Sequence, residues 1–153
     1  MGSFQTPWHY SFLQKSLEDS GYEASILNLP STGGWTVVPD ALAKDTAAVR
    51  SAVQEQINLG NDVVVVAHSQ GGVGASAALE GLGKTGQVCM VKIYPSLPQK
   101  VLTSGDRSKP GVLHVVYIQA FLLEVGITAV DKIGGNQAPW LEVKVSARFP
   151  ASH

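Results

Sequence analysis

The feature that most constrains the fold is a short apolar run that ends in a cluster of small and polar residues. Residues 63–67 are continuously apolar, and His68-Ser69-Gln70-Gly71-Gly72 follows directly. An uninterrupted apolar run is typical of a parallel strand that is buried on both faces of its sheet. The small residues from Val73 to about Leu82 favour a helix. The sequence therefore predicts a buried strand, a sharp turn at Ser69 and then a helix.

Strands and helices alternate along the rest of the chain. We expect helices at residues 6–20 and 39–59, and strands at residues 23–29, 62–67 and 112–120. This alternation predicts an α/β fold with a mainly parallel sheet and helices on both faces. Residues 84–111 are long for a connection in this architecture, so we interpret them as an atypical insertion in which residues 88–94 are a candidate strand. The length of 153 residues predicts a single domain over residues 1–153.

Composition excludes several classes of partner. The chain has 11 basic and 12 acidic side chains and a formal net charge of -1, which argues against binding to nucleic acid or to an anionic membrane. Its apolar runs are too short to span a bilayer, and its N-terminus does not resemble a secretory signal. The single cysteine, Cys89, excludes an internal disulfide and predicts a cytoplasmic location. The sequence implies no metal and no organic cofactor.

The turn at Ser69 carries the chemistry. A serine between a strand and a helix presents its hydroxyl at the carboxyl end of the sheet, where ligands bind in open α/β folds. We therefore interpret Ser69 as a nucleophile, with Gly71 allowing the turn to close. The backbone N–H of Gln70 is then placed to donate to an oxyanion at the start of the helix. The alternative is that Ser69 only caps this helix.

Several motifs resemble α/β-hydrolases. Residues 2–10 (GSFQTPWHY), Gly21-Tyr22 and residues 27–30 (LNLP) are similar to the first turn, the tryptophan-bearing helix and the following strand of that family. Residues 63–72 resemble its nucleophile elbow, with Ala67 in place of the usual glycine. The likeness covers residues 2–83 and 112–126, and it is strongest to small fungal and bacterial proteins of the methylesterase and hydroxynitrile-lyase-like group.

The resemblance implies an incomplete α/β-hydrolase fold, cut short at both ends, with a sheet of three to five strands. It also implies that the backbone N–H of Ser3 joins that of Gln70 in an oxyanion hole, although Gly2 and Ser3 could equally form a disordered terminus. The family's strand before Gly2 is missing, and in the family it normally lies between the other two recognised strands. The unpaired sheet edge predicts self-association, or a partner chain that supplies the missing strands.

The acid and the base of a catalytic triad stay unknown at this stage. In the family an acid and then a histidine follow the serine along the chain. His68 adjoins the serine and should point elsewhere, and His9 lies in the first helix. The candidates after Ser69 are each more often surface or structural residues: His114, His153, Glu80, Asp106, Glu124, Asp131 and Glu142.

The resemblance implies a serine esterase that acts on a small-molecule ester. Ser69 would attack the acyl carbon, while the N–H groups of Gln70 and Ser3 would hold the oxyanion. The aromatic residues Phe4, Trp8 and Phe121 would favour an apolar substrate, although such residues are more often in the core. Two alternatives stay open: a catalytically inactive, truncated hydrolase or binding remnant, and a lyase on the same scaffold.

Overall fold

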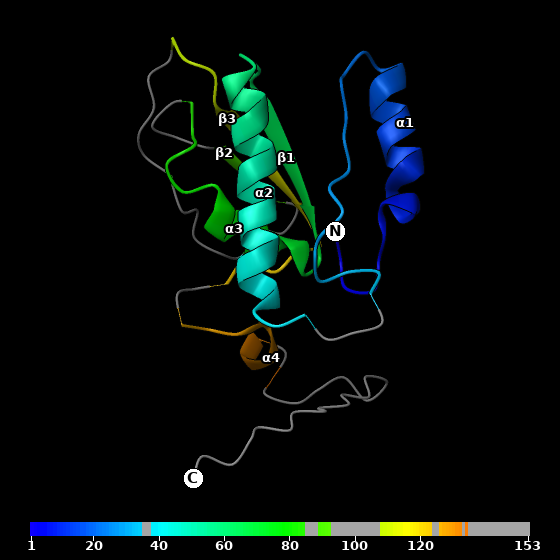
Figure 1. Cartoon of the computed structure of the whole chain (residues 1–153), viewed down its shortest axis with the longest axis vertical. Helices are drawn as coiled ribbons and strands as arrows, with labels where there is room; N and C mark the ends of the chain where they lie inside the picture. The colour runs from blue at the N-terminus through cyan, green and yellow to red at the C-terminus, as the bar shows by residue number, and fades with distance from the viewer. Residues whose placement is uncertain (35–37, 85–88, 93–107, 124–125, 133, 135–153) are drawn as a thin grey trace. The chain divides into compact units, whose positions relative to one another are not determined.

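The computed structural model describes residues 1–34, 38–84, 89–92, 108–123, 126–132 and 134 (Figure 1). The contacts within the chain divide it into two units, Met1–Leu122 and Leu123–His153. The first unit contains the sheet and the long helices, and the second contains a short helix, α4 (Ala129–Lys132). None of the helices in the described ranges has the length and apolar character that a membrane crossing needs.

Parallel strands form the sheet of the first unit. They are β1 (Val63–His68), β2 (Cys89–Lys92) and β3 (Val112–Ile118), in the spatial order β1-β3-β2. Both pairings are parallel, so the predicted mainly parallel sheet is confirmed. Strand β2 lies inside the segment that we interpreted as an insertion, at the candidate strand over residues 88–94.

The predicted helices are present with slightly shorter bounds. Helix η1 (Pro7–Tyr10) is a 3-10 turn that leads into α1 (Ser11–Asp19), and α2 (Ala41–Asn58) follows later in the chain. Gly21 and Gly60 end α1 and α2, with φ of 87° and 92°. After each glycine, the next N–H donates back to the helix at 3.0 Å. This is the glycine-terminated cap that the two Gly positions predict.

The core lies between one face of the sheet and two helices, α2 and α3 (Gly71–Ala78), as Figure 1 shows. Its buried members come from both helices, from β1 and β3, and from the residues that follow α3: Val53, Ala67, Ala75, Leu79, Leu82, Val112, Val115 and Tyr117. A hydrogen bond of 2.8 Å between Ser76 Oγ and the Tyr117 hydroxyl joins α3 to β3. Arg50 of α2 donates to the carbonyl of Ala78 at 2.8 Å and so caps the end of α3. These contacts fix α3, and the turn before it, on the sheet.

Two of our strand predictions are wrong. Residues 23–29 form no strand, because no neighbouring strand takes up their backbone hydrogen bonds. Strand β1 is not buried on both faces: Val64 and Val66 are 51% and 42% exposed. Helices α2 and α3 cover only the opposite face of β1. Among the described residues β1 pairs with β3 alone, so its other edge has no partner.

Candidate functional site

The candidate site is built on an abrupt bend between β1 and α3. Ser69 follows the last residue of β1 and has φ of 52°, in the left-handed region. Its N–H donates to the carbonyl of Ile118 at 3.3 Å. Its own carbonyl accepts from the N–H of Gly72 at 3.2 Å and of Phe121 at 3.0 Å. The backbone of Ser69 is therefore held by β3, by the loop after β3 and by the start of α3.

The conformation of Ser69 is costly and is not that of a helix cap. An L-residue in the left-handed region loses about 1–2 kcal/mol relative to the right-handed one. The residue that precedes α3 is Gln70, and no side chain caps the helix there. Ser69 is half-buried, and within the described ranges its hydroxyl has no hydrogen-bond partner. The side chain of Ser69 therefore does not cap α3, as the alternative required.

Glycines allow other backbone segments to approach the start of α3 closely. A Cβ atom on Gly71 would lie 2.5 Å from the carbonyl oxygen of Met1. A Cβ atom on Gly72 would lie 2.5 Å from the carbonyl oxygen of Phe121. Neither distance is tolerated by real side chains, so both positions need glycine. The first residues of the chain and the loop after β3 therefore pack directly against the turn that contains Ser69.

Residues 2–5 form a second tight turn beside Ser69. The N–H of Gln5 donates to the carbonyl of Gly2 at 3.3 Å, and Phe4 has φ of 61°. Gly2 is buried, and a Cβ atom on it would lie 3.0 Å from Ser69 Cβ. Ser3 Oγ donates to the side-chain oxygen of Gln70. The structure thus brings together Ser3, Ser69 and Gln70, the residues that the sequence analysis selected.

Two backbone donors at this junction are free. Among the described residues no acceptor takes the N–H of Ser3 or the N–H of Gln70. The N–H of Gln70 also lies at the amino end of α3, where the helix dipole gives a partial positive charge. Free N–H groups on residues next to a serine are suited to holding a negatively charged oxygen.

A cluster of polar side chains that the sequence analysis missed packs against Gly2 beside Ser69. The Tyr10 hydroxyl accepts the N–H of Gly2 at 2.8 Å and lies 2.9 Å from Nδ1 of His68. Tyr10 also donates to the side-chain oxygen of Gln5, which lies 3.0 Å from Nδ1 of His68. As expected, His68 is engaged away from Ser69. No local pattern signals this cluster, because Tyr10 and His68 are 58 positions apart.

The other histidines in the described part of the chain do not reach Ser69. Nδ1 of His9 accepts the N–H of Thr6 at 3.0 Å and so belongs to the start of η1. His114 is exposed on β3, next to Val64 in the sheet register. His153 lies outside the described residues. Within the described ranges, therefore, no imidazole is placed to take the proton of Ser69.

Two of the candidate acids, Glu80 and Asp131, lie in the described part of the chain. Glu80 is exposed after α3, and Asp106, Glu124 and Glu142 lie outside the described residues. In the second unit Asp131 accepts the N–H of Thr128 at 2.8 Å and its hydroxyl at 2.6 Å. These hydrogen bonds lower the pKa of Asp131 below its ordinary value. Asp131 therefore stabilises the start of α4. Across the described ranges, no group of His, Cys, Asp and Glu side chains could hold a metal ion.

One buried carboxylate was not foreseen. Asp45 of α2 is only 9% exposed, and its oxygens accept the N–H of Ser31 at 2.9 Å and the hydroxyl of Ser31 at 2.6 Å. Because both oxygens accept from Ser31, Asp45 holds the loop at residues 30–34 onto α2. Its Cβ lies 3.9 Å from where a Cβ atom on Gly74 would stand, so this helix contact is close without being tight. We assign Asp45 a structural role.

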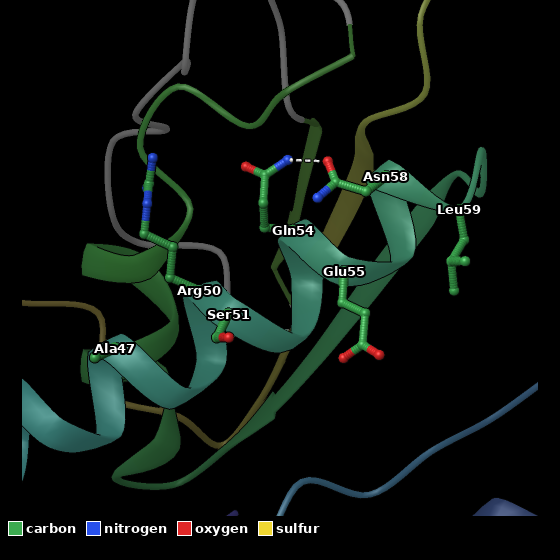
Figure 2. Close-up of a pocket in the computed structure, with 7 residues that line it drawn as sticks. All are labelled: Ala47, Arg50, Ser51, Gln54, Glu55, Asn58 and Leu59. Carbon is green, nitrogen blue, oxygen red and sulfur yellow. Dashed lines mark hydrogen bonds between the residues drawn. The ribbon is translucent and has the colours of Figure 1, made fainter.

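A surface hollow of about 660 Å³ lies on α2 (Figure 2), and Ser69 is not among the residues that line it. Its lining comes from a single helix and the residue after it: Ala47, Arg50, Ser51, Gln54, Glu55, Asn58 and Leu59. Gln54 and Asn58 are hydrogen-bonded to each other at 3.0 Å. The hollow contains no nucleophile paired with a base, and it adds nothing to the site at Ser69.

The chain is similar to curated proteins that are named as hydrolases. It is 30% identical over 137 residues to Probable hydrolase R7 of Phoma sp., a match that covers 89% of this chain and 46% of the relative. It is 32% identical over 83 residues to Alpha/beta hydrolase nvfD of Aspergillus novofumigatus, which covers 54% of this chain and 33% of the relative. The chain thus spans less than half the length of these relatives.

No family model matches the chain, and no solved structure matches it significantly. The similarity therefore rests on the two relatives and on the fold. In the fold, a strand of a parallel sheet is followed by a sharp turn and a helix, in the order that the resemblance implies. The chain is related to the α/β-hydrolase superfamily.

Proposed function

We propose that this chain supplies the nucleophile and the oxyanion site of a serine hydrolase that acts on a small-molecule ester. The observation that most supports the proposal is the left-handed backbone of Ser69, with φ of 52°, between a parallel strand and a helix. A strained residue at such a junction is common at active sites, where the surrounding structure offsets its cost. Both relatives are named as hydrolases, which agrees with the proposed activity.

The proposed reaction proceeds in two halves. In the first, Ser69 Oγ forms a bond to the acyl carbon as its proton passes to a base, and the carbonyl oxygen becomes negatively charged. The N–H groups of Gln70 and Ser3 donate to that oxygen. Each such donor typically lowers the free-energy barrier by about 2.7–4 kcal/mol, because it stabilises the transition state. The bond between the acyl carbon and the alcohol oxygen then breaks, and the alcohol leaves with the proton from the base. In the second half, water attacks the acyl carbon and gives a proton to the base. The bond from the acyl carbon to Ser69 Oγ breaks, the carboxylic acid leaves, and the base returns the proton to the Ser69 hydroxyl.

The proposal requires a base that the described residues do not provide. No described imidazole contacts Ser69, and Nδ1 of His68 faces Tyr10 and Gln5. The base must therefore come from residues outside the described ranges or from another chain. If neither supplies one, the chain is the catalytically inactive hydrolase or binding remnant that we considered as the alternative.

Labelling with a fluorophosphonate tests the proposal. Serine hydrolases attack the phosphorus atom of this reagent, fluoride leaves, and a stable phosphonyl adduct remains on the nucleophile. We expect a single adduct by intact-mass measurement, and we expect its loss in Ser69→Ala. The matched control is Ser51→Ala, which removes an exposed serine of α2 and should label like the wild type. No adduct on the wild type, or an adduct that persists in Ser69→Ala, would overturn the proposal.

A further inference from the structure

We propose that Tyr10 is a positioning residue that fixes the Ser3 N–H donor beside Ser69. It acts through a hydrogen-bonded group that we call the Tyr10 cluster, which consists of Tyr10, Gln5 and His68. The inference deepens the proposed function and rests on it for its effect on reactivity. Its effect on the Gly2–Ser3 backbone stands independently and is measured separately below.

The Tyr10 cluster joins three parts of the chain. Tyr10 ends η1, Gln5 closes the turn at residues 2–5, and His68 is the last residue of β1. The rings of Tyr10 and His68 meet edge to face, with centroids 5.9 Å apart. The Tyr10 hydroxyl accepts the N–H of Gly2 at 2.8 Å, lies 2.9 Å from Nδ1 of His68, and donates to Gln5. One hydroxyl thus connects the first turn of the chain to the end of strand β1.

Gly2 packs against both the Tyr10 cluster and the nucleophile. A Cβ atom on Gly2 would lie 2.7 Å from the side-chain oxygen of Gln5, 3.0 Å from Nδ1 of His68 and 3.0 Å from Ser69 Cβ. The cluster and Ser69 therefore both border the space that a side chain at Gly2 would occupy, with no room to spare. A shift of the cluster would change the position of Gly2 relative to Ser69.

The geometry of one peptide group connects Gly2 to the proposed oxyanion donor. The Gly2 N–H is held by Tyr10 at 2.8 Å, and the Gly2 carbonyl is held by the N–H of Gln5 at 3.3 Å. In a planar trans peptide the carbonyl of Gly2 and the N–H of Ser3 point in opposite directions. Because both ends of Gly2 are held, the direction of the Ser3 N–H is fixed as well. Removal of the Tyr10 hydroxyl would release one of the two restraints.

The cluster also predicts that Nδ1 of His68 carries a proton. The side-chain oxygen of Gln5 only accepts hydrogen bonds, and it already receives the Tyr10 hydroxyl. The contact of 3.0 Å between this oxygen and Nδ1 of His68 therefore requires a proton on Nδ1. A His68 ring with a proton on Nδ1 satisfies every member of the cluster. The ¹⁵N shifts of His68 report this proton and therefore the contact between His68 and Gln5.

The test compares Tyr10→Phe with Tyr22→Phe. The first change keeps the ring against His68 and removes only the hydroxyl. The second removes the hydroxyl of a tyrosine that is 66% exposed, and this hydroxyl forms no hydrogen bond in the described part of the chain. We expect fluorophosphonate labelling of Ser69 to slow about tenfold in Tyr10→Phe, less than the roughly hundredfold or greater loss typical of deleting an oxyanion donor outright. Tyr22→Phe should label at the wild-type rate.

Two nuclear magnetic resonance measurements separate this inference from the proposed function. The heteronuclear NOE of the Ser3 amide should fall in Tyr10→Phe alone. The ¹⁵N shifts of His68 should keep the pattern of a protonated Nδ1 in both variants, because the side-chain oxygen of Gln5 still accepts from Nδ1, and this would show that the rest of the cluster is intact. If the wild type labels and Tyr10→Phe labels equally fast, the inference is overturned. If the wild type does not label, the proposed function fails, and an unchanged Ser3 NOE in Tyr10→Phe overturns the positioning role too. A lowered NOE in that case supports the positioning role without the hydrolase activity.

Discussion

A glycine at position 69 should make the protein more stable than an alanine at the same position. Ser69→Gly and Ser69→Ala both remove the hydroxyl, so their comparison isolates the backbone. Glycine adopts φ of 52° without steric cost, whereas alanine keeps the Cβ atom that makes this conformation unfavourable. At most positions of a folded protein the alanine variant is the more stable one, because glycine has more conformational freedom to lose on folding.

The magnitude follows from two opposing effects. Relief of the left-handed conformation contributes about 1–2 kcal/mol in favour of glycine. The larger entropy of the unfolded glycine chain offsets about 0.4–1 kcal/mol of this. We therefore expect the free energy of unfolding of Ser69→Gly to exceed that of Ser69→Ala by about 0.5–1 kcal/mol.

Urea denaturation of both variants measures this difference at equilibrium. Ser51 serves as the matched control, since it is exposed within α2 and has a helical backbone. There Ser51→Gly should be less stable than Ser51→Ala by about 0.8–1 kcal/mol, the opposite sign. Equal urea dependence of the variants would show that the unfolded states are comparable. If Ser69→Gly is no more stable than Ser69→Ala, the backbone at this position is not left-handed and our account of the turn is refuted.

Three further predictions concern the surroundings of this turn. Gly72→Ala should lower the free energy of unfolding by about 1–3 kcal/mol in urea denaturation, because its Cβ would lie 2.5 Å from the carbonyl oxygen of Phe121; unchanged stability would show that this contact is not tight. Lys84 hydrogen-bonds to Asp62 at 2.5 Å and lowers the pKa of Asp62 below its ordinary value of 3.8. The ionised Asp62 then stabilises the folded state at pH values above 3.8, and this stabilisation is lost as the pH falls through the lower pKa of the folded state. The free energies of unfolding of the wild type and Asp62→Asn should therefore differ at pH 7 and converge in acid. A difference that does not depend on pH would contradict this prediction. We also propose that the free edge of β1 supports self-association, so sedimentation should show concentration-dependent association of the wild type that Val66→Lys abolishes; a wild type that is monomeric throughout would remove the proposal.

Features that depend on neighbouring residues in the sequence could be predicted. The apolar run over residues 63–67, the small residues after it and the glycines at positions 21 and 60 each signal their structure locally. They give β1, the turn at Ser69, α3 and the helix ends close to where the structure has them. The turn at Ser69 is predictable because a strand, a serine and two glycines leave few backbone paths into a helix.

Features that depend on distant partners could not be predicted. The pattern of residues 23–29 favours a strand, but a strand forms only where another strand completes its hydrogen bonds, and no local pattern reports the partner. The same reason explains the exposure of Val64 and Val66, since their burial depends on an element packed over them. The Tyr10 cluster was missed because its members come together only in the folded chain.

The candidate site shows the same division. Ser69 and Gln70 follow from the local motif, whereas the position of Ser3 beside Gln70 was an expectation from family resemblance. Asp45 was missed because a carboxylate on an amphipathic helix is ordinarily exposed, and only the hydrogen bonds from Ser31 account for its burial. The acid and base could not be predicted because no residue type after Ser69 stands at a spacing that marks it.

A crystal structure of the protein after treatment with a fluorophosphonate tests the central claim most directly. Our account predicts a phosphonyl group on Ser69 Oγ, a positive φ at that residue, and a phosphonyl oxygen within about 2.7–3.1 Å of the N–H groups of Gln70 and Ser3. A Ser69 with helical φ, or a hydroxyl enclosed by its own helix with no free N–H beside it, would contradict the account.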